Sequence, residues 1–432
     1  MRITFFTRVT GCLSHTSVRL AITLALLITA SSAGFSQQLA FPGAEGFGRF
    51  ASGGRGGTVY LVTNLNDSGE GSFRDAVSAP NRTVIFKLSG VIKIDKKIAV
   101  SPHITIAGQT APGEGITVYG NSVSFSDNSI IRYIRFRGSI DMSRGSCTVI
   151  ADNLKDIIFD HVSITWGRWD NLHIKKSTNV TLQYCLIAES IDPQRFGALL
   201  EVPVNITMHH CLFSGNQSRN PKAKAQIEFL NNIIYNWGKS GYVGGHSSAD
   251  HYQDIVGNYF IAGPNSSQEF ISMFTATDHV YQRDNYADLD KDGKLNGRLV
   301  TDDDFNKKSA TLLPAPTHMA KTNVVISSAA AAAKVVMQEV GSSLKRDAVD
   351  KRIISYFKSL GKTGEIFKNE HDAGGQPSGK PTGVNGKDLD ANGIPDRWEG
   401  KHKTVVQVTA DSKELPENNY TPLEVYLNSL VK

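Results

Sequence analysis

Short strand-like runs recur along the middle of the chain, and this repeat limits the fold more than any other feature. Residues 179–186 (NVTLQYCL) match residues 205–212 (NITMHHCL) at an offset of 26 residues. Similar runs follow around Asn232, 21 residues after Cys211, and around Asn258, another 26 residues on. A strand-rich repeat of about 20–30 residues is typical of a solenoid whose neighbouring coils share one core.

The composition of the runs favours one kind of solenoid. Between residues 83 and 262 they are rich in β-branched and aromatic residues and are separated by Gly, Asn, Asp and Ser. No helix of ordinary length lies between them, which argues against βαβ units, and propeller blades need about 40–50 residues. We therefore predict a right-handed parallel β-helix. Cys185, Cys211, Asn232 and Asn258 should occupy equivalent positions, with the two asparagines forming an amide ladder.

The two ends of the chain differ from this repeat. Residues 1–36 combine three arginines, an apolar run and small residues, which is typical of a secretory signal peptide. The apolar run is too short for a membrane anchor, so we expect a secreted protein, extracellular or periplasmic. Residues 37–325 are assigned to the β-helix. Residues 326–432 form a C-terminal extension. The stretches 323–337, at the boundary, and 347–360, within the extension, carry helix-forming residues.

Charge and cysteine content exclude some classes of function. The formal charge of +5, from 46 basic and 41 acidic residues, is too slight and too evenly spread for a nucleic-acid partner. Cys147, Cys185 and Cys211 remain after the signal peptide and are too few for a disulfide framework. We expect them to be buried free thiols, and no Cys/His spacing indicates a zinc site.

Several motifs resemble one family, the secreted polysaccharide lyases of the pectate lyase type (family 1). They lie in residues 41–48 (FPGAEGFG), 53–60, 63–76, 105–113 and 159–167 (FDHVSITWG). The resemblance implies a parallel β-helix that cleaves pectate, or a related uronic-acid polysaccharide, by β-elimination to unsaturated products. It also implies an acidic plant-type polysaccharide as partner and a monomeric enzyme.

Residues 219–224 (RNPKAK) match the family motif Arg-x-Pro-x-x-Arg. Arg219 stands where the family has the arginine assigned as catalytic base. Lys224 stands where a second arginine binds a substrate carboxylate, and it keeps the charge but not the bidentate geometry.

The family's calcium positions match less well. Alignment places Cys147, Trp169 and His173 where acidic ligands usually stand. Asp170 is either a displaced calcium ligand or a partner for Arg168 or Lys175. We expect His173 to pack inside the stack.

Without calcium, the charge that neutralises the substrate must come from side chains. Five residues are candidates for substrate binding, four cations and one aromatic ring: Lys222, Lys224, Arg168, Arg195 and Trp169. The alternatives are a surface salt bridge for Arg195 and packing in the core or cap for Trp169.

An acidic loop near the C-terminus predicts a separate, structural calcium site. Asp388, Asp390, Asn392 and Asp396 place oxygen ligands about two residues apart around a glycine turn, as Ca²⁺ prefers. This site would stabilise a loop and take no part in the chemistry.

Two other functions remain open at this point. A β-helical glycoside hydrolase would need two carboxyl groups about the scissile bond, and no such pair is visible on neighbouring repeats. A non-catalytic carbohydrate-binding β-helix would also explain the missing acidic ligands, although the Arg219 motif argues against it.

Overall fold

The computed structural model describes residues 37–318, 322–383, 386–403 and 420–431. The predicted signal peptide lies outside them. Leu39–Lys432 forms one compact unit, which holds every element described below. No helix in the described ranges is long and apolar enough to cross a membrane.

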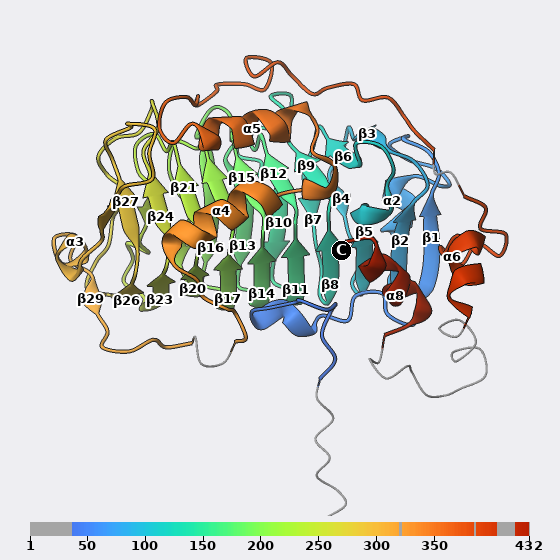
Figure 1. The fold of residues 1–432 in the computed structure, drawn as a ribbon, viewed down its shortest axis with the longest axis horizontal. Helices are drawn as coiled ribbons and strands as arrows, with labels where there is room; N and C mark the ends of the chain where they lie inside the picture. Colours follow the sequence, from blue (N-terminus) through green and yellow to red (C-terminus); the bar gives the residue numbers. More distant parts are fainter. Residues whose placement is uncertain (1–36, 319–321, 384–385, 404–419, 432) are drawn as a thin grey trace, which may run out of the picture. The chain divides into compact units, whose positions relative to one another are not determined.

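Three sheets form the body of this unit, and the chain passes through each sheet once per coil (Figure 1). Their strands are parallel except for β28, which pairs antiparallel with β27. The eleven-stranded sheet comprises β1 (Thr58–Val62), β2 (Arg82–Phe86), β5 (Ile104–Ala107), β8 (Ser129–Arg132), β11 (Lys155–Asp160), β14 (Thr178–Gln183), β17 (Val204–His209), β20 (Gln226–Leu230), β23 (His251–Val256), β26 (Asp278–Arg283) and β29 (Thr311–Leu312). The ten-stranded sheet comprises β3 (Gly90–Lys93), β6 (Ile116–Tyr119), β9 (Arg135–Arg137), β12 (Ser163–Thr165), β15 (Leu186–Ala188), β18 (Leu212–Ser214), β21 (Ile233–Tyr235), β24 (Tyr259–Ile261), β27 (Tyr286–Asp288) and β28 (Arg298–Leu299). The eight-stranded sheet comprises β4 (Ile98–Ala99), β7 (Val123–Ser124), β10 (Val149–Asp152), β13 (Asp170–Lys175), β16 (Phe196–Glu201), β19 (Lys222–Lys224), β22 (Tyr242–Val243) and β25 (Ile271–Ser272).

Strand pairing places equivalent residues of successive coils side by side. Leu182 of β14 pairs with Met208 of β17, and both side chains are buried in the core between the sheets. Leu186 likewise pairs with Leu212, so the preceding Cys185 and Cys211 lie on adjacent coils and are buried free thiols. The predicted parallel β-helix is therefore confirmed, and its strands begin before and end after the repeats visible in the sequence.

An asparagine ladder closes one corner of the stack. The side-chain Oδ1 of Asn258 accepts hydrogen bonds from the backbone N–H (2.8 Å) and side chain (3.2 Å) of Asn232. Asn285 does the same for Asn258, at 3.0 and 2.9 Å. All three side chains are buried, and each Nδ2 also donates to a backbone carbonyl. The predicted ladder is confirmed and has a third rung.

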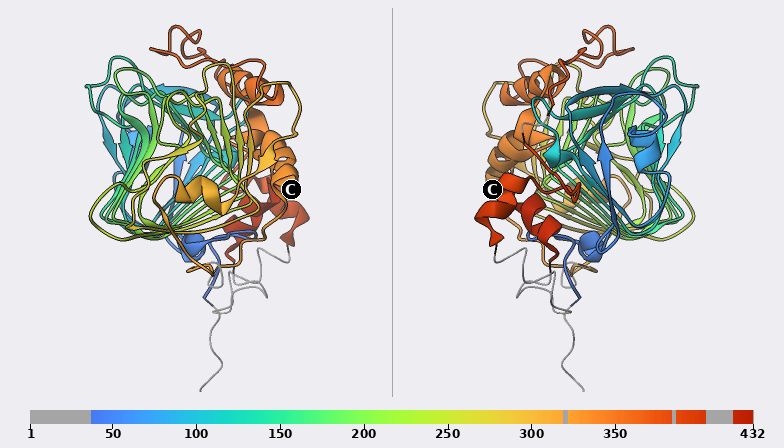
Figure 2. Two further views of the ribbon diagram at one scale, coloured as in Figure 1. Left: turned by 90° about the vertical axis from the view of Figure 1, so that its left-hand side faces the viewer. Right: turned by 90° about the vertical axis from the view of Figure 1, so that its right-hand side faces the viewer.

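The C-terminal extension contributes helices that pack on the coils rather than fold alone (Figure 2). Apolar residues of α4 and α5 join one buried cluster with the outer side chains of the ten-stranded sheet. Ser328 and Asp347 cap the two helices by accepting hydrogen bonds from backbone N–H groups. The α-helices are α2 (Phe73–Ala76), α3 (Asp302–Asn306), α4 (Ala329–Glu339), α5 (Ala348–Lys358), α6 (Asp396–Lys401) and α8 (Pro422–Ser429); the 3-10 helices are η1 (Phe47–Phe50), η2 (Gly108–Thr110) and η4 (Ser343–Lys345).

A segment near the N-terminus covers the outer face of the eleven-stranded sheet. Gly48 in η1 donates its N–H to the hydroxyl of Thr181 (2.8 Å). A Cβ atom at Gly48 would lie 2.2 Å from the carbonyl oxygen of Ile157, so only glycine permits this approach. Helices α4 and α5 cover the ten-stranded sheet, and η1 covers part of the eleven-stranded sheet. The charged outer face of the eight-stranded sheet is therefore the candidate location of a functional site.

The ladder should contribute strongly to stability. Asn258→Ala would leave the N–H of Asn232 and the carbonyl of Phe229 without their partners in a buried environment. We expect a loss of about 3 kcal/mol or more in the free energy of unfolding, measured by urea denaturation. The exposed Asn66 provides the matched control, because Asn66→Ala should change stability by less than about 0.5 kcal/mol. Equal effects of the two substitutions would contradict the ladder's role.

Candidate functional site

The outer face of the eight-stranded sheet carries a band of charged side chains. Strand alternation turns Leu172, Ala198, Leu200 and Ala223 into the core. Their neighbours therefore point outward, and the register aligns Lys175 of β13 with Glu201 of β16 and Lys224 of β19. The outward residues in this band are His173, Lys175, Glu201, Lys222 and Lys224.

At one edge of this band Arg219 forms an ion pair with Asp170. Asp170 pairs with Phe196 on the next coil, and Phe196 forms a bridge to Ser218 on the coil after that. This register brings Nη1 of Arg219 to 3.1–3.2 Å from both carboxylate oxygens of Asp170. The Arg219 guanidinium also lies 4.1 Å from the centre of the Phe196 ring. Two contacts thus fix the arginine that the resemblance matches to the family's catalytic base.

The two members of this pair differ in their exposure. The Asp170 side chain is fully buried, whereas 19% of the Arg219 side chain is exposed. Burial raises the pKa of Asp170 to about 6, although Arg219 and His173 favour its charged form. Asp170 is thus an ion-pair partner, as one of the two alternatives from the sequence held, but its partner is Arg219 rather than Arg168 or Lys175.

A hollow of about 640 Å³ opens beside Arg219. Phe196, Lys222, Lys239 and Glu269 are among the residues that line it. Lys222 and Lys239 make no ion pair with any described residue, whereas Glu269 pairs with Lys308 at 2.6 Å. Burial, reinforced by Lys224 and Arg219, lowers the pKa of Lys222. The hollow therefore carries positive charge that the protein does not neutralise.

His173 lies on the outer face of the sheet, so the prediction that it packs inside the stack is wrong. Its ring nitrogens lie 3.1 Å from Asp152 and 3.2 Å from Glu201, on the strands to either side. Burial lowers the pKa of His173, but the hydrogen bonds to these two carboxylates outweigh it and raise the pKa. The prediction overlooked the alternation of side chains along β13. Leu172 and Ile174 point into the core, so His173 between them points outward.

The other predicted substrate-binding residues do not line the hollow. Arg168 donates to the carbonyls of Asp192 and Met142, at 3.0 and 2.7 Å, and so supports the backbone. Arg195 forms an ion pair with Asp192 at 3.1 Å. Trp169 is half-buried, and its carbonyl accepts a hydrogen bond from the N–H of Phe196. None of these three residues lines the hollow, and Lys224 lies next to Lys222 on β19 without lining it either.

Cys147, which the resemblance aligns with an acidic calcium ligand of the family, lies beside Asp170. Burial, followed by the charge of Asp170, raises the pKa of the Cys147 thiol to about 12. A thiol that keeps its proton is a poor metal ligand. Within the described ranges, no group of three or more His, Cys, Asp or Glu side chains is arranged to hold a metal ion.

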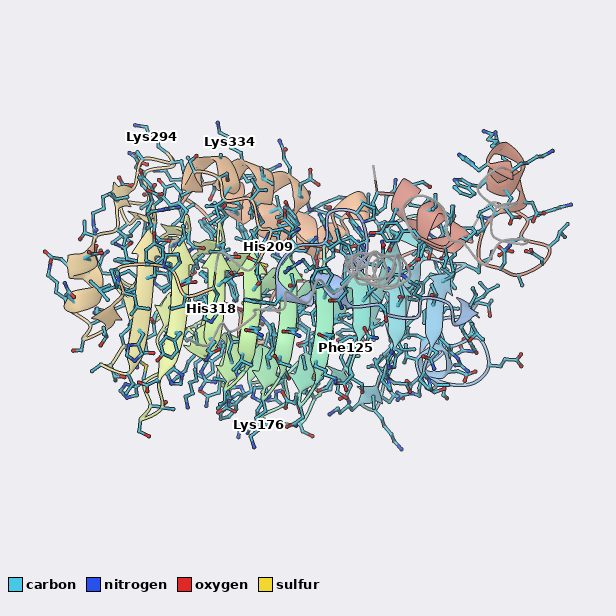
Figure 3. The ribbon with its side chains drawn as sticks, turned by 90° about the horizontal axis from the view of Figure 1, so that it is seen from below. Phe125, Lys176, His209, Lys294, His318 and Lys334 are labelled. Atoms are coloured by element: carbon cyan, nitrogen blue, oxygen red, sulfur yellow. The ribbon has the colours of Figure 1, made fainter. Side chains whose placement is uncertain are left out.

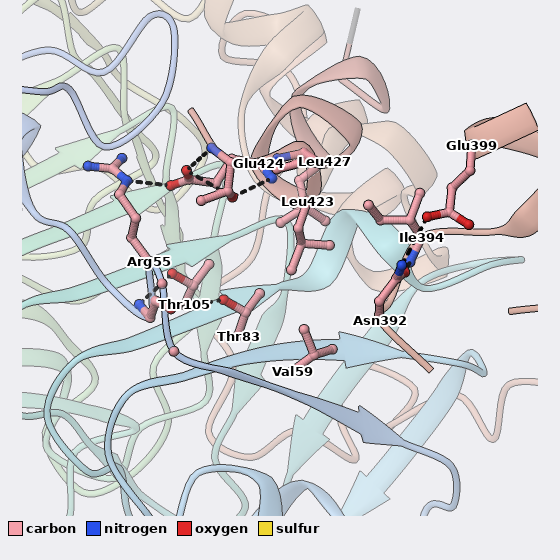
Figure 4. A pocket seen from close by; sticks show the side chains of 15 residues that line it. Arg55, Val59, Thr83, Thr105, Asn392, Ile394, Glu399, Leu423, Glu424 and Leu427 are labelled. Carbon is pink, nitrogen blue, oxygen red and sulfur yellow. Dashed lines mark hydrogen bonds and ion pairs between the residues drawn. The ribbon is translucent and has the colours of Figure 1, made fainter. Parts of the chain in front are cut away.

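The acidic C-terminal loop borders a second hollow, of about 370 Å³, between the eleven-stranded sheet and α8 (Figure 4). Asn392 donates from its side chain to Asp390 (2.8 Å) and to Glu399 (2.9 Å). Asp396 accepts from the backbone N–H of Leu389. Asp388 pairs with Lys87 through Oδ2 at 2.8 Å, while its Oδ1 is buried without a partner. An unpartnered carboxylate oxygen in this loop is compatible with a cation.

Sequence reasoning missed Phe196, Gln217, Lys239 and Glu269 as residues of the hollow. They lie in β16 and in loops between coils, where the repeat pattern gives no signal. Only the spatial alignment of coils brings them beside Arg219.

Comparison with known proteins gives consistent results, although no family model matches the chain. The chain is 44% identical over 401 residues to the probable pectate lyase C of Aspergillus flavus, which covers 92% of this chain and 95% of that protein. It is 42% identical over 418 residues to the probable pectate lyase C of Aspergillus fumigatus, covering 96% and 99%. A solved pectate lyase bound to a hexasaccharide shares the fold, with a TM-score of 0.53, 14% identity and coverage of 73% and 100%.

Burial of Asp170 should make stability depend on pH. Its carboxyl group binds a proton more tightly in the folded chain, with a pKa of about 6, than at its ordinary pKa of 3.8. The free energy of unfolding should therefore fall by up to about 3 kcal/mol as pH rises through this interval. Asp170→Asn should remove that part of the decrease, measured by urea denaturation at a series of pH values. The exposed Asp95 supplies the control variant, Asp95→Asn. An unchanged pH dependence in Asp170→Asn would contradict the assigned burial cost.

Proposed function

The chain belongs to the pectate lyase family, and from this membership we propose that it cleaves pectate by β-elimination on the outer face of the eight-stranded sheet. The observation that carries the proposal is the position of Arg219, held by Asp170 at the edge of a positively charged hollow. Pectate is a polyanion, so a hollow with unpaired lysines matches the charge of the substrate.

β-Elimination needs positive charge close to the substrate. The proton on C5 of a uronate becomes acidic only when the neighbouring carboxylate is neutralised, because its removal creates further negative charge. Lys222 and Lys239 are cations of the hollow without an ion-pair partner among the described residues, and Arg219, which Asp170 pairs, is a third only while it keeps its proton. The side chains themselves can thus supply the charge that stabilises the transition state.

We propose that Arg219 first gives up a proton to solvent and, in its neutral form, accepts the C5 proton while the C4–O4 bond breaks and the departing O4 takes a proton from water. Asp170 is then a positioning residue, because it holds Nη1 of Arg219 without lining the hollow. The ring of Phe196 contacts the guanidinium from a second side and restricts its movement. An arginine fixed in this way needs little reorganisation when the substrate binds.

The charge state of the hollow favours elimination over hydrolysis. A glycoside hydrolase needs two carboxyl groups that act on the scissile bond. The carboxyl groups at this place, Asp170 and Glu269, are each paired with a cation, Arg219 and Lys308. Neither pair supplies the free carboxylic acid and the free carboxylate that hydrolysis of a sugar linkage needs.

The remaining alternative is a carbohydrate-binding protein without catalytic activity. Such a protein would release no unsaturated product from the polysaccharide.

We propose that calcium has a structural role in this protein. Asp388, Asp390, Asn392 and Asp396 would hold it in the C-terminal loop, and the unpartnered Oδ1 of Asp388 supports this assignment. A bound Ca²⁺ would connect the loop to the strands through Asp388, which already contacts Lys87, the residue after β2. We further propose secretion as a monomer, supported by the signal-like composition of residues 1–36.

Arg219→Lys should lower the rate of elimination by more than about tenfold, because the charge is kept but the guanidinium geometry is lost. The measurement is the ultraviolet absorbance of the unsaturated uronate released from polygalacturonate. Arg283→Lys, at an exposed position on β26, is the matched control and should retain activity. A folded Arg219→Lys enzyme with more than about a tenth of the wild-type rate would exclude Arg219 as the base.

Calcium should stabilise the protein more than it affects turnover. A metal that binds only the folded state raises the free energy of unfolding by about 2.7 kcal/mol at a hundredfold excess over its Kd. Chelation should therefore lower the melting temperature, and Asp390→Ala combined with Asp396→Ala should remove most of that sensitivity. Asp302→Ala with Asp303→Ala should leave the sensitivity unchanged. If chelation instead stops turnover with no change in melting temperature, the calcium is catalytic.

A further inference from the structure

We infer that Asn216 is a positioning residue for the elimination, because its buried amide connects the turn that carries Arg219 with the start of the strand that carries Asp170. This inference rests on the proposed function, since it concerns how the same arginine is held. Asn216 does not line the hollow, so it acts through the residues that it binds.

Four polar side chains form a hydrogen-bonded network at the corner between the ten-stranded and eight-stranded sheets. They belong to Asn171 at the start of β13, Ser190 in the turn before β16, and Asn216 and Asn220 in the turn before β19. All four residues are buried. The strands of successive coils lie side by side (Figure 3), so side chains from these consecutive coils meet. The asparagine ladder described above lies elsewhere, at the corner between the eleven-stranded and ten-stranded sheets.

Asn216 is the centre of this network, and both ends of its amide are used. Its Oδ1 accepts hydrogen bonds from Nδ2 of Asn171 (3.1 Å) and from the N–H and hydroxyl of Ser190 (3.1 and 3.2 Å). Its Nδ2 donates to the carbonyl of Ile187 and to Oδ1 of Asn220, both at 3.0 Å. A side-chain amide offers two donors and one accepting oxygen. No part of the Asn216 amide is therefore free for another partner.

The network reaches both members of the ion pair through the chain. Asn171 directly follows Asp170, and Asn220 directly follows Arg219. Two hydrogen bonds between amides therefore connect these neighbours through Asn216, while the ion pair itself joins Asp170 to Arg219 at 3.1 Å. The carboxylate and the guanidinium are thus held in register by a second, fully buried connection.

The backbone of Arg219 requires such support. Its φ of +59° lies in the left-handed region, which residues other than glycine seldom adopt. A conformation of this kind persists only where the surroundings hold it. The carbonyl of Arg219 accepts a hydrogen bond from the N–H of Ala198 (2.7 Å), and the N–H of Asn220 donates to the carbonyl of Gly241 (3.1 Å). Asn216 adds the contact that fixes the Asn220 side chain, and with it the peptide that follows Arg219.

Loss of this contact should affect the chemical step more than substrate binding. A base that is displaced from the C5 proton reacts more slowly, whereas Lys222 and Lys239 still attract the polyanion. Asn216→Ala should therefore lower kcat on polygalacturonate by about tenfold or more and leave KM within about twofold of the wild-type value. Both constants are measured by the absorbance of the unsaturated product, at a temperature at which circular dichroism shows the variant to be folded.

Asn258→Ala is the matched control, because it removes a buried amide of the same kind from the other corner of the stack. It should lower the melting temperature by a similar amount but keep kcat within about twofold of wild type. A merely structural role of Asn216 would give the two variants the same kinetics.

Two further variants test the network if Asn216→Ala does not fold. Asn171→Ala breaks the connection on the side of Asp170 and should lower kcat by about fivefold or more. Ser190→Ala removes a hydroxyl that binds only Asn216 and should keep kcat within about twofold.

The outcomes separate this inference from the proposed function. A folded Asn216→Ala or Asn171→Ala enzyme with unchanged kcat overturns the inference, as does a rise in KM alone or an equal loss of kcat in Asn258→Ala. Each of these results leaves the proposed function intact when the wild type releases unsaturated product. If the wild type releases none, the proposed function fails, and a crystal structure of Asn216→Ala or Asn171→Ala tests the inference instead. The Arg219 guanidinium should then be displaced from Asp170, and an unchanged ion pair would overturn the inference.

Discussion

The register between parallel strands is the constraint on which both the core and the candidate site depend. Each coil hydrogen-bonds to the next, so a residue can change its neighbour only if the coil length changes. Leu182 and Met208 meet in the core for this reason, as do Asn232 and Asn258 at the corner. The same register on the eight-stranded sheet places Asp170, Phe196 and Arg219 on successive coils. The fold thus builds a row of chemical groups from residues far apart in the sequence.

The pair of Asp170 and Arg219 shows how this scaffold uses charge. A buried carboxylate is costly in free energy, and the raised pKa of Asp170 reflects that cost. The ion pair and the Phe196 ring hold the arginine at the edge of the hollow, where its side chain remains partly exposed. Burial of the Asp170 carboxylate therefore lowers the stability of the fold, and the same carboxylate holds the Arg219 guanidinium in one position. The unpaired Lys222 and Lys239 then add the positive charge that a polyanion needs.

Periodic features of the sequence were sufficient to predict the solenoid, the asparagine ladder and the two long helices of the extension. Each depends on local composition or on a repeat of similar residues. The pairing of Asp170 with Arg219, 49 residues apart, was not predictable in the same way. Paired residues in this region are 23, 26 and 21 apart in successive coils, as Ile157, Val180, Ile206 and Ile227 show. A small change in coil length decides which charged residues meet. The sequence shows the offsets of the similar strand runs, but it does not show which charged side chains outside those runs lie opposite each other. Lys239 was missed for the related reason that loops follow no repeat.

The central claim is that the chain breaks a glycosidic bond by elimination at this face. Digestion of polygalacturonate in water enriched in a heavy oxygen isotope tests it most directly, with the products weighed by mass spectrometry. Elimination adds no water, so the account predicts unsaturated oligosaccharides that carry no isotope incorporated by cleavage. Saturated products that have gained one labelled oxygen per cleaved bond would contradict it and show that the enzyme is a hydrolase.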